Sequence, residues 1–223
     1  SSPTRRSSDL PLIDNLHDVQ AKLPSHVTLV AVSKTKPIED IETLYQAGQR
    51  DFGENRVQEM AKKAAVLPSD IHWHMIGHIQ SNKVKDFASF VHMVHSVDRN
   101  KVANALNKAA AKNERNINVL LQMHIATESS KQGYELEELQ AFQPEDYPHL
   151  TICGLMGMAT FTDDKSQIST EFQCLQSAFD GLKERFSPAF KQISMGMSGD
   201  FQLAIEKGST MVRVGSSIFG QRS

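Results

Sequence analysis

The sequence has few of the residues that build disulfide scaffolds, metal centres or membrane spans. Its 223 residues include two cysteines, Cys153 and Cys174, which form neither a CxxC pair nor a zinc-type spacing. Two isolated cysteines favour a reduced, cytoplasmic protein over a secreted one. No apolar run approaches the roughly 18 residues that a membrane-spanning helix needs. No signal peptide is recognisable either, because no apolar segment follows the arginines near the N-terminus.

An excess of charge of one sign is also lacking. The 24 basic and 26 acidic residues give a formal net charge of −2. Such a balance offers no basic field for generic nucleic-acid binding and no acidic tail. The length suits one large α/β domain or two small ones. A domain of this size buries roughly 70–75% of its unfolded surface, so it needs no disulfide or metal to be stable.

The first ten residues differ from the rest of the chain. Residues 1–10 are polar and have neither a helical nor a strand period, and residues 3–10 match the reading frame of a common sequencing adapter. We therefore expect residues 1–10 to be disordered or artefactual, and residues 11–223 to form one domain. Finding the same codons at the genomic locus would remove the artefact hypothesis.

From residue 12 onward, apolar residues alternate between helical stripes and short strand-like runs. After an opening helix, strands are expected at 27–33, 51–53, 71–76, 91–94, 117–125, 150–156, 192–195 and 211–214. Helical patterns separate them at 37–48, 57–66, 81–87, 98–112, 135–142, 167–186 and 200–207. Alternation of this kind indicates parallel βαβ units, and eight of them in one chain favour a closed (β/α)8 TIM barrel. A doubly wound open sheet is the alternative.

Lys34 stands at the carboxyl end of the first expected strand. A charged lysine cannot join an apolar core without a large desolvation cost. Either its amine reaches water, or its surroundings lower its pKa and make it a nucleophile that forms imines.

The loops after the last two expected strands are rich in glycine and serine. They span residues 194–200 and 213–220. In a TIM barrel, phosphate groups often bind at these two places, on backbone N–H groups and hydroxyls. Each loop alone could be an ordinary turn or helix cap. A nucleotide-binding loop is rejected for 215–220, because the Lys-Ser/Thr pair is missing and no helix is expected afterwards. A strand-end lysine and a phosphate cup in one barrel mouth fit pyridoxal 5′-phosphate (PLP).

A series of short motifs resembles the pyridoxal phosphate homeostasis proteins, in order from about residue 27 to 222. They are AVSKTKP at 31–37, FGEN at 52–55 with VQE at 57–59, HMIG at 74–77 with QSNK at 80–83, GLM at 154–156, MGMS at 195–198, and RVG at 213–215 with IFG at 218–220. Each motif alone is weak, but together they are highly specific. The resemblance implies a fold like the barrel domain of alanine racemase, and PLP bound as a Schiff base on Lys34.

The same resemblance assigns further residues to the cofactor. The phosphate would be held by Ser198 with its neighbours Met197 and Gly199, and by Gly215 and Ser216. Arg213 would face the pyridine nitrogen, and Asn55 would lie beside the ring. Three additional candidates are His74, as a hydrogen-bonded residue near the ring, Lys36, as an exposed or cofactor-transferring lysine, and Lys131, which lines the mouth or caps a loop.

Arg213 favours cofactor binding over turnover. A protonated guanidinium only donates hydrogen bonds, so the pyridine nitrogen that it meets stays unprotonated and the cofactor is a weak electron sink. Racemisation also needs an acid or base opposite the lysine. The resemblance places that tyrosine on a second domain of a partner subunit, and no tyrosine of this chain stands at a strand end. We expect no catalytic residue.

The expected protein is therefore a monomeric PLP carrier that limits the damage done by a reactive aldehyde and releases the cofactor to apoenzymes. A PLP-dependent racemase is the first alternative, and a phosphate-binding barrel enzyme without imine chemistry is the second. A metal site is not expected, because His72 and His74 share a strand face but no third ligand follows at zinc spacing. Ser198 is not expected to be a hydrolytic nucleophile, because no GxSxG motif is present.

Overall fold

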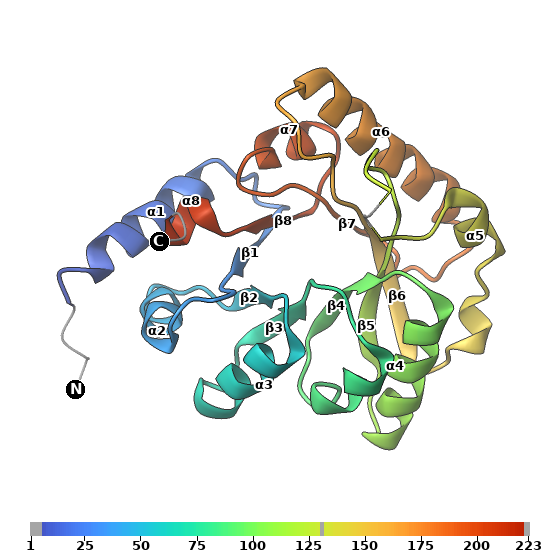
Figure 1. Cartoon of the computed structure of the whole chain (residues 1–223), viewed down its shortest axis with the longest axis horizontal. Coiled ribbons are helices and arrows are strands. Elements are labelled where there is room, and N and C mark those ends of the chain that lie inside the picture. The colour runs from blue at the N-terminus through green and yellow to red at the C-terminus, as the bar shows by residue number, and fades with distance from the viewer. Residues whose placement is uncertain (1–5, 130–131, 221–223) are drawn as a thin grey trace.

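The chain folds into a closed barrel of parallel strands surrounded by helices (Figure 1). A computed structural model describes residues 6–129 and 132–220. Within this part of the chain the strands are β1 (Thr28–Val32), β2 (Asp51–Glu54), β3 (His72–Met75), β4 (Met93–Val97), β5 (Ile117–Gln122), β6 (Leu150–Met156), β7 (Gln192–Ser194) and β8 (Met211–Val214). The strands pair in chain order, and β8 pairs with β1 to close the barrel. The predicted TIM barrel is confirmed, and the open sheet is wrong.

The helices pack on the outside of this barrel. They are α1 (Asp9–Ala21), α2 (Ile38–Gln46), α3 (Val57–Val66), α4 (Asn100–Lys112), α5 (Leu136–Ala141), α6 (Lys165–Leu182), α7 (Phe201–Glu206) and α8 (Ser216–Phe219), with 3-10 helices η1 (Ser81–Asp86) and η2 (Pro144–Asp146). The first and last helices lie side by side (Figure 1), and the Asn15 side chain donates to the Ile218 carbonyl at 2.9 Å. None of the helices described is long and apolar enough to cross a lipid bilayer.

Two apolar layers hold the barrel together. The larger one fills the space between strands and helices, with fully buried side chains such as Leu16, Phe52 and Phe172. The smaller one lies inside the barrel and consists of Val30, Met93, Leu120, Cys153, Met156 and Met211. The barrel interior is therefore a packed core, as in other TIM barrels, and any polar side chain inside it needs a partner.

Helix α1 begins inside the segment that was expected to be disordered. Asp9 is buried, and its carboxylate accepts hydrogen bonds from the Arg6 amide at 2.9 Å and the Thr43 hydroxyl at 3.1 Å. Residues 9 and 10 of the segment expected to be disordered or artefactual thus lie in a helix, and Asp9 ties the start of that helix to α2. Residues 1–5 lie outside the described residues.

Two further predictions about the strands and helices were wrong. Strand β4 was expected to end at Val94, but it continues through His95 and Ser96 to Val97. Both polar residues are buried, and the Ser96 hydroxyl donates to the Gly77 carbonyl at 2.6 Å. A helix, α8, also follows β8, where none was expected.

Candidate functional site

Lys34 lies in a tight turn directly after β1 and is partly buried. Thr35 has a φ of +63°, a left-handed conformation that β-branched residues rarely adopt. Its N–H donates to a carboxylate oxygen of Glu59 at 2.7 Å, and the N–H of Lys36 donates to the Ser33 carbonyl at 3.0 Å. The peptide groups on both sides of Lys34 are thus held by hydrogen bonds, which fixes the direction in which its side chain leaves the turn.

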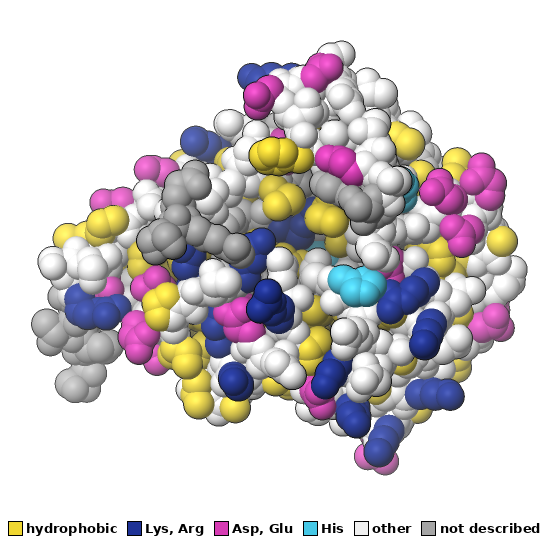
Figure 2. Space-filling model, viewed as in Figure 1, with side chains coloured by type: hydrophobic (Ala, Val, Ile, Leu, Met, Phe, Trp, Pro, Cys, Tyr) yellow, Lys and Arg dark blue, Asp and Glu magenta, His cyan; other side chains and the backbone are white. Residues whose placement is uncertain are grey.

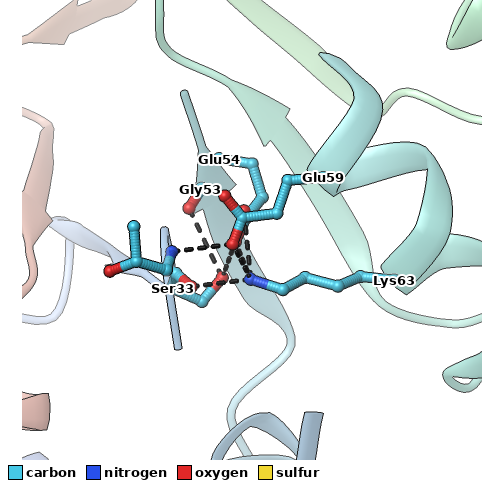
Figure 3. Close-up of polar contacts among 6 residues, drawn as sticks. Ser33, Gly53, Glu54, Glu59 and Lys63 are labelled. Carbon is cyan, nitrogen blue, oxygen red and sulfur yellow. Dashed lines mark hydrogen bonds and ion pairs between the residues drawn. The ribbon is translucent and has the colours of Figure 1, made fainter. Parts of the chain in front are cut away.

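A buried ionic network connects this turn to β2 and α3 (Figure 3). The Lys63 ammonium donates to the Ser33 carbonyl at 2.8 Å, to Glu54 at 3.0 Å and to Glu59 at 2.7 Å. The Ser33 hydroxyl also donates to the Glu54 carboxylate and lies within hydrogen-bond distance of the Gly53 carbonyl. Charge-assisted hydrogen bonds in a dry environment are strong and directional. None of these residues except Ser33 belongs to the turn, so the network anchors the turn from outside.

The two carboxyl groups of this network differ in protonation. Burial raises the pKa of Glu54 to about 7, against the opposing effect of the Ser33 and Lys63 hydrogen bonds. Burial also acts to raise the pKa of Glu59, but hydrogen bonds from Lys63 and the Thr35 amide outweigh it and lower that pKa. Burial therefore favours the protonated form of Glu54, whereas Glu59 is held in its ionised form beside Lys63.

The two loops expected to form a phosphate cup meet each other. The Ser198 hydroxyl oxygen, after β7, accepts hydrogen bonds from the N–H groups of Gly215 and Ser217 at 3.2 Å each. These amides open helix α8, and Ser216 lies exposed between them. Convergent N–H groups of this kind can bind an anion. Ser198, Gly215 and Ser216 were predicted here from the sequence, but Ser217 of the same glycine-serine loop was not.

The other residues of the β7 loop shape its turn. The N–H of Met197 donates to the Asp200 carboxylate at 2.7 Å, and Gly199 is exposed. Gly196 has a φ of +105°, and a Cβ added there would lie 2.9 Å from the Cα of Phe201. Only glycine fits without strain, so this position fixes how closely the loop approaches α7.

Arg213 lies one layer deeper, inside the barrel. Its guanidinium donates to the Ser194 hydroxyl and, at 3.2 Å, to the Gly157 carbonyl. Burial lowers its pKa to about 10, so the side chain is still charged at neutral pH. A charged guanidinium can only donate, as expected from the sequence.

A chain of buried hydrogen bonds runs from Arg213 through the barrel interior. Ser194 is bonded to His95 at 2.8 Å, His95 to His74 at 2.8 Å, and His74 to Asp51 at 2.8 Å. Burial and the nearby charges of His74 and Arg213 lower the pKa of His95 well below 6.5, so its imidazole is neutral. The chain of bonds satisfies every polar group that it contains.

His74 is therefore hydrogen-bonded, but to partners that the sequence did not suggest. It was expected near the ring, and its contacts are with His95 and with Asp51 at the start of β2. His95, Ser194 and Asp51 were missed altogether. His95 lies two residues after Met93, so its side chain points to the same inner face of the barrel. This could be recognised only once β4 was known to continue past Val94.

Asn55 follows β2 directly and is partly buried, and its backbone lies close to Gly77 in the loop after β3. A Cβ on Gly77 would lie 2.2 Å from the Asn55 carbonyl oxygen, so the two loops are in close contact. Lys36 lies in the same turn as Lys34 and is partly buried. Lys131 lies outside the described residues.

The candidate residues come together at one end of the barrel. Lys34, Asn55, Ser198 and Gly215 follow β1, β2, β7 and β8, which are four consecutive strands of the closed sheet. Because parallel strands all end at the same rim, these loops share one mouth. Figure 2 shows this face hollowed near its centre, with Lys or Arg atoms and hydrophobic atoms inside the hollow. Two glycine-serine loops and a lysine therefore follow strands at one rim of the barrel, and the buried Arg213 lies on one of these strands.

Comparisons with known proteins agree with this arrangement. The family model of the alanine racemase N-terminal domain matches residues 11–223. The pyridoxal phosphate homeostasis protein of Pasteurella multocida is 43% identical, over 91% of this chain and 90% of that protein. The protein of the same name from Escherichia coli K12 is 40% identical, over 89% and 87%.

Solved structures show the same fold. PipY of Synechococcus elongatus, in a structure with PLP bound, has a TM-score of 0.85 and 34% identity, over 94% of this chain and all of that one. The alanine racemase of Bartonella henselae, which carries covalently bound PLP, has a TM-score of 0.72 but 17% identity, over 96% of this chain and 59% of that one. The chain therefore belongs to the pyridoxal phosphate homeostasis proteins, a family built on the alanine racemase N-terminal domain.

Proposed function

We propose that this chain binds PLP as a Schiff base on Lys34 and takes part in PLP homeostasis without a turnover reaction of its own. The observation that carries the proposal is that the Lys34 turn and the hydrogen-bonded Ser198 and Gly215 loops follow adjacent strands, β1, β7 and β8, at the same rim of the barrel. The names of the relatives and the PLP-bound PipY structure support it.

The donors at this rim fit the chemical groups of PLP. Its phosphate needs several N–H donors, and those of Gly215 and Ser217 already converge on one oxygen, that of Ser198. Its pyridine nitrogen is an acceptor, which suits the donor-only side chain of Arg213. When bound, PLP supplies an aldehyde that condenses with a lysine amine and releases water.

The protein's own residues then have distinct roles. The Lys63 network holds the turn so that the Lys34 amine is presented at one place, which lowers the entropic cost of forming the bond. Arg213 keeps its proton at neutral pH, so it does not protonate the pyridine nitrogen and leaves the ring a poor electron sink. The site is thus suited to hold the aldehyde rather than to stabilise a carbanion.

A homeostatic role implies reversible binding and a destination for the cofactor. We propose that the chain acts as a monomer in the cytoplasm and passes PLP to apoenzymes. Two free cysteines, one buried and one exposed, suit a reducing compartment. Met197, Gly199 and Ser216 complete the proposed phosphate loops, Asn55 is proposed beside the ring, and Lys36 is the second lysine that could receive PLP from Lys34.

Amino-acid racemisation is the competing function, because alanine racemases share this barrel. Those enzymes are 13–17% identical to this chain, and the match spans 57–60% of their length, so the likeness concerns the fold. Racemisation needs a proton donor opposite the lysine. The hydroxyls of Tyr45 and Tyr134 are hydrogen-bonded to Asp70 and Asn100, and Tyr147 is buried. None of these tyrosines is therefore placed as a proton donor opposite Lys34.

Exchange of the α-hydrogen separates the two functions. The PLP-loaded chain would be incubated with L- and D-alanine in heavy water, beside a Lys34→Ala control. We expect no deuterium at the α-carbon above the control. Incorporation that depends on Lys34 would establish enzyme chemistry and overturn the carrier role.

A further inference from the structure

We propose that Asp51, His72 and His92 form a binding site for a first-row transition metal ion such as Zn²⁺, at the end of the barrel opposite Lys34. The three side chains offer one carboxylate oxygen and two imidazole nitrogens, all within 4.8 Å of one another. This site is separate from the proposed PLP site and does not rest on it.

The barrel brings the three residues together at the starts of adjacent strands. Asp51 is the first residue of β2 and His72 the first of β3, and the two are directly opposite each other in the sheet. His92 immediately precedes β4, and its N–H donates to the Trp73 carbonyl at 2.8 Å. Each ligand therefore stands on a strand end that the fold holds in place.

One pair of ligand atoms already has the spacing of a tetrahedral metal site, and the His92 ring has to turn to complete it. Asp51 Oδ1 and His72 Nδ1 are 3.2 Å apart. Two ligands about 2.0–2.1 Å from a zinc ion are roughly 3.4 Å apart at the tetrahedral angle. A cation can therefore replace the proton that these two atoms share, with little movement of either side chain.

The second imidazole is already beside the first. The rings of His72 and His92 stack with centroids 4.2 Å apart and an angle of 15° between their planes. The His72 side chain is 47% exposed, so an ion can reach it from solvent and the ring has room to turn toward it.

Two neighbouring side chains affect the proposed site: one orients the Asp51 carboxylate, and the other adds positive charge near His92. His74 is bonded to Asp51 Oδ1 at 2.8 Å, the kind of outer contact that orients a metal-binding carboxylate. The Arg115 guanidinium, bound to the carbonyls of Ala88 and Val91 at 2.8 Å each, adds positive charge near His92 and weakens the attraction for a cation.

The ligand set selects the class of ion. Two imidazoles and one carboxylate suit Zn²⁺, Ni²⁺ or Cu²⁺, whereas Mg²⁺ and Ca²⁺ prefer sites made of oxygen atoms. Three protein ligands leave a fourth position for water. Spacing along the chain could not reveal the site, because residues 51, 72 and 92 are separated by whole βα units.

The test is a zinc titration of the PLP-loaded chain, made without a polyhistidine tag and stripped of metal by a chelator. Zinc affinity would be measured by competition with a chromophoric chelator for the wild type and for His72→Asn and His92→Asn. The matched control is His149→Asn, because His149 is exposed and stands directly before β6 at the same end of the barrel. Circular dichroism would confirm that each variant is folded.

We expect one zinc ion per chain and an affinity at least tenfold weaker in both His72→Asn and His92→Asn, with His149→Asn unchanged. Zinc should also shift the imidazole NMR signals of His72 and His92 and leave the visible absorbance of PLP unaltered. Equal affinity in wild type and His72→Asn, or signals that shift at His149 instead, would overturn the proposal. A change confined to the PLP absorbance would place the metal at the other end and overturn it too.

Discussion

At the residue scale, the proposed PLP site depends on how one lysine is held. Lys34 was recognisable from the sequence because a lysine at the end of an apolar strand needs an explanation. The residues that hold it were not recognisable. Glu54 and Glu59 stood out only as parts of two family motifs and Lys63 not at all, but the Lys63 side chain is only 6% exposed. Burial of a charge depends on which loop packs over it, and local sequence does not contain that information.

Replacing Glu54 by glutamine should change how stability depends on pH. The pKa of Glu54 is raised in the folded state from 4.5 to about 7, so the folded chain holds this proton more tightly than the unfolded chain. That contribution to stability is fully present below about pH 4.5 and is lost as pH rises through 7. At about 1.4 kcal/mol per pKa unit it is on the order of 3 kcal/mol.

Urea unfolding of the wild type and of Glu54→Gln at several pH values would check this. The free energy of unfolding of the wild type should fall relative to the variant between pH 4.5 and 7. A difference between the two that stays constant over this range would show that Glu54 titrates normally.

At the element scale, the loops that end strands β7 and β8 form the proposed phosphate site. Their glycine and serine content was enough to predict the place, because TIM barrels bind phosphate there. The pairing of Ser198 with the amides of α8 was not predictable, since the helix itself had been missed. Four helical residues with two serines at the start carry too little periodicity to be recognised.

Gly196→Ala should damage this loop, whereas Gly199→Ala should not. An added methyl group at Gly196 would meet Ala204 and Phe201, and its φ of +105° disfavours alanine, at a cost of about 1–3 kcal/mol. A Cβ at Gly199 has nothing within 4 Å. Thermal unfolding and PLP affinity would both be measured. Equal effects of the two substitutions would mean that the β7 loop is not constrained at Gly196.

At the scale of the whole molecule, the closed barrel was predictable and its polar interior was not. Eight alternating strand and helix patterns favour the barrel over an open sheet, whatever the exact boundaries. The chain of bonds from Arg213 to Asp51 involves side chains from five strands, β2, β3, β4, β7 and β8. Such contacts depend on register around the whole barrel, which no single segment specifies.

The neutral imidazole of His95 should make the barrel sensitive to acid. Its folded pKa lies well below 6.5, so the unfolded chain binds this proton more readily. Stability from this residue is present above about pH 6.5 and falls as pH decreases below that value. In His95→Gln the free energy of unfolding should be lower at neutral pH and should decrease less steeply between pH 6.5 and 5. A slope equal to that of the wild type would show that His95 is not the titrating group.

The most direct test of PLP binding to Lys34 is to locate the bond between PLP and the chain. The purified protein would be incubated with PLP, reduced with borohydride, digested and analysed by peptide mass mapping, with Lys36→Ala as the matched control for Lys34→Ala. Binding of PLP to Lys34 predicts a pyridoxyl group on Lys34 in the wild type and in Lys36→Ala, and none at this turn in Lys34→Ala. A wild type that binds PLP with its pyridoxyl group on another lysine, or that retains no PLP at all, would contradict it.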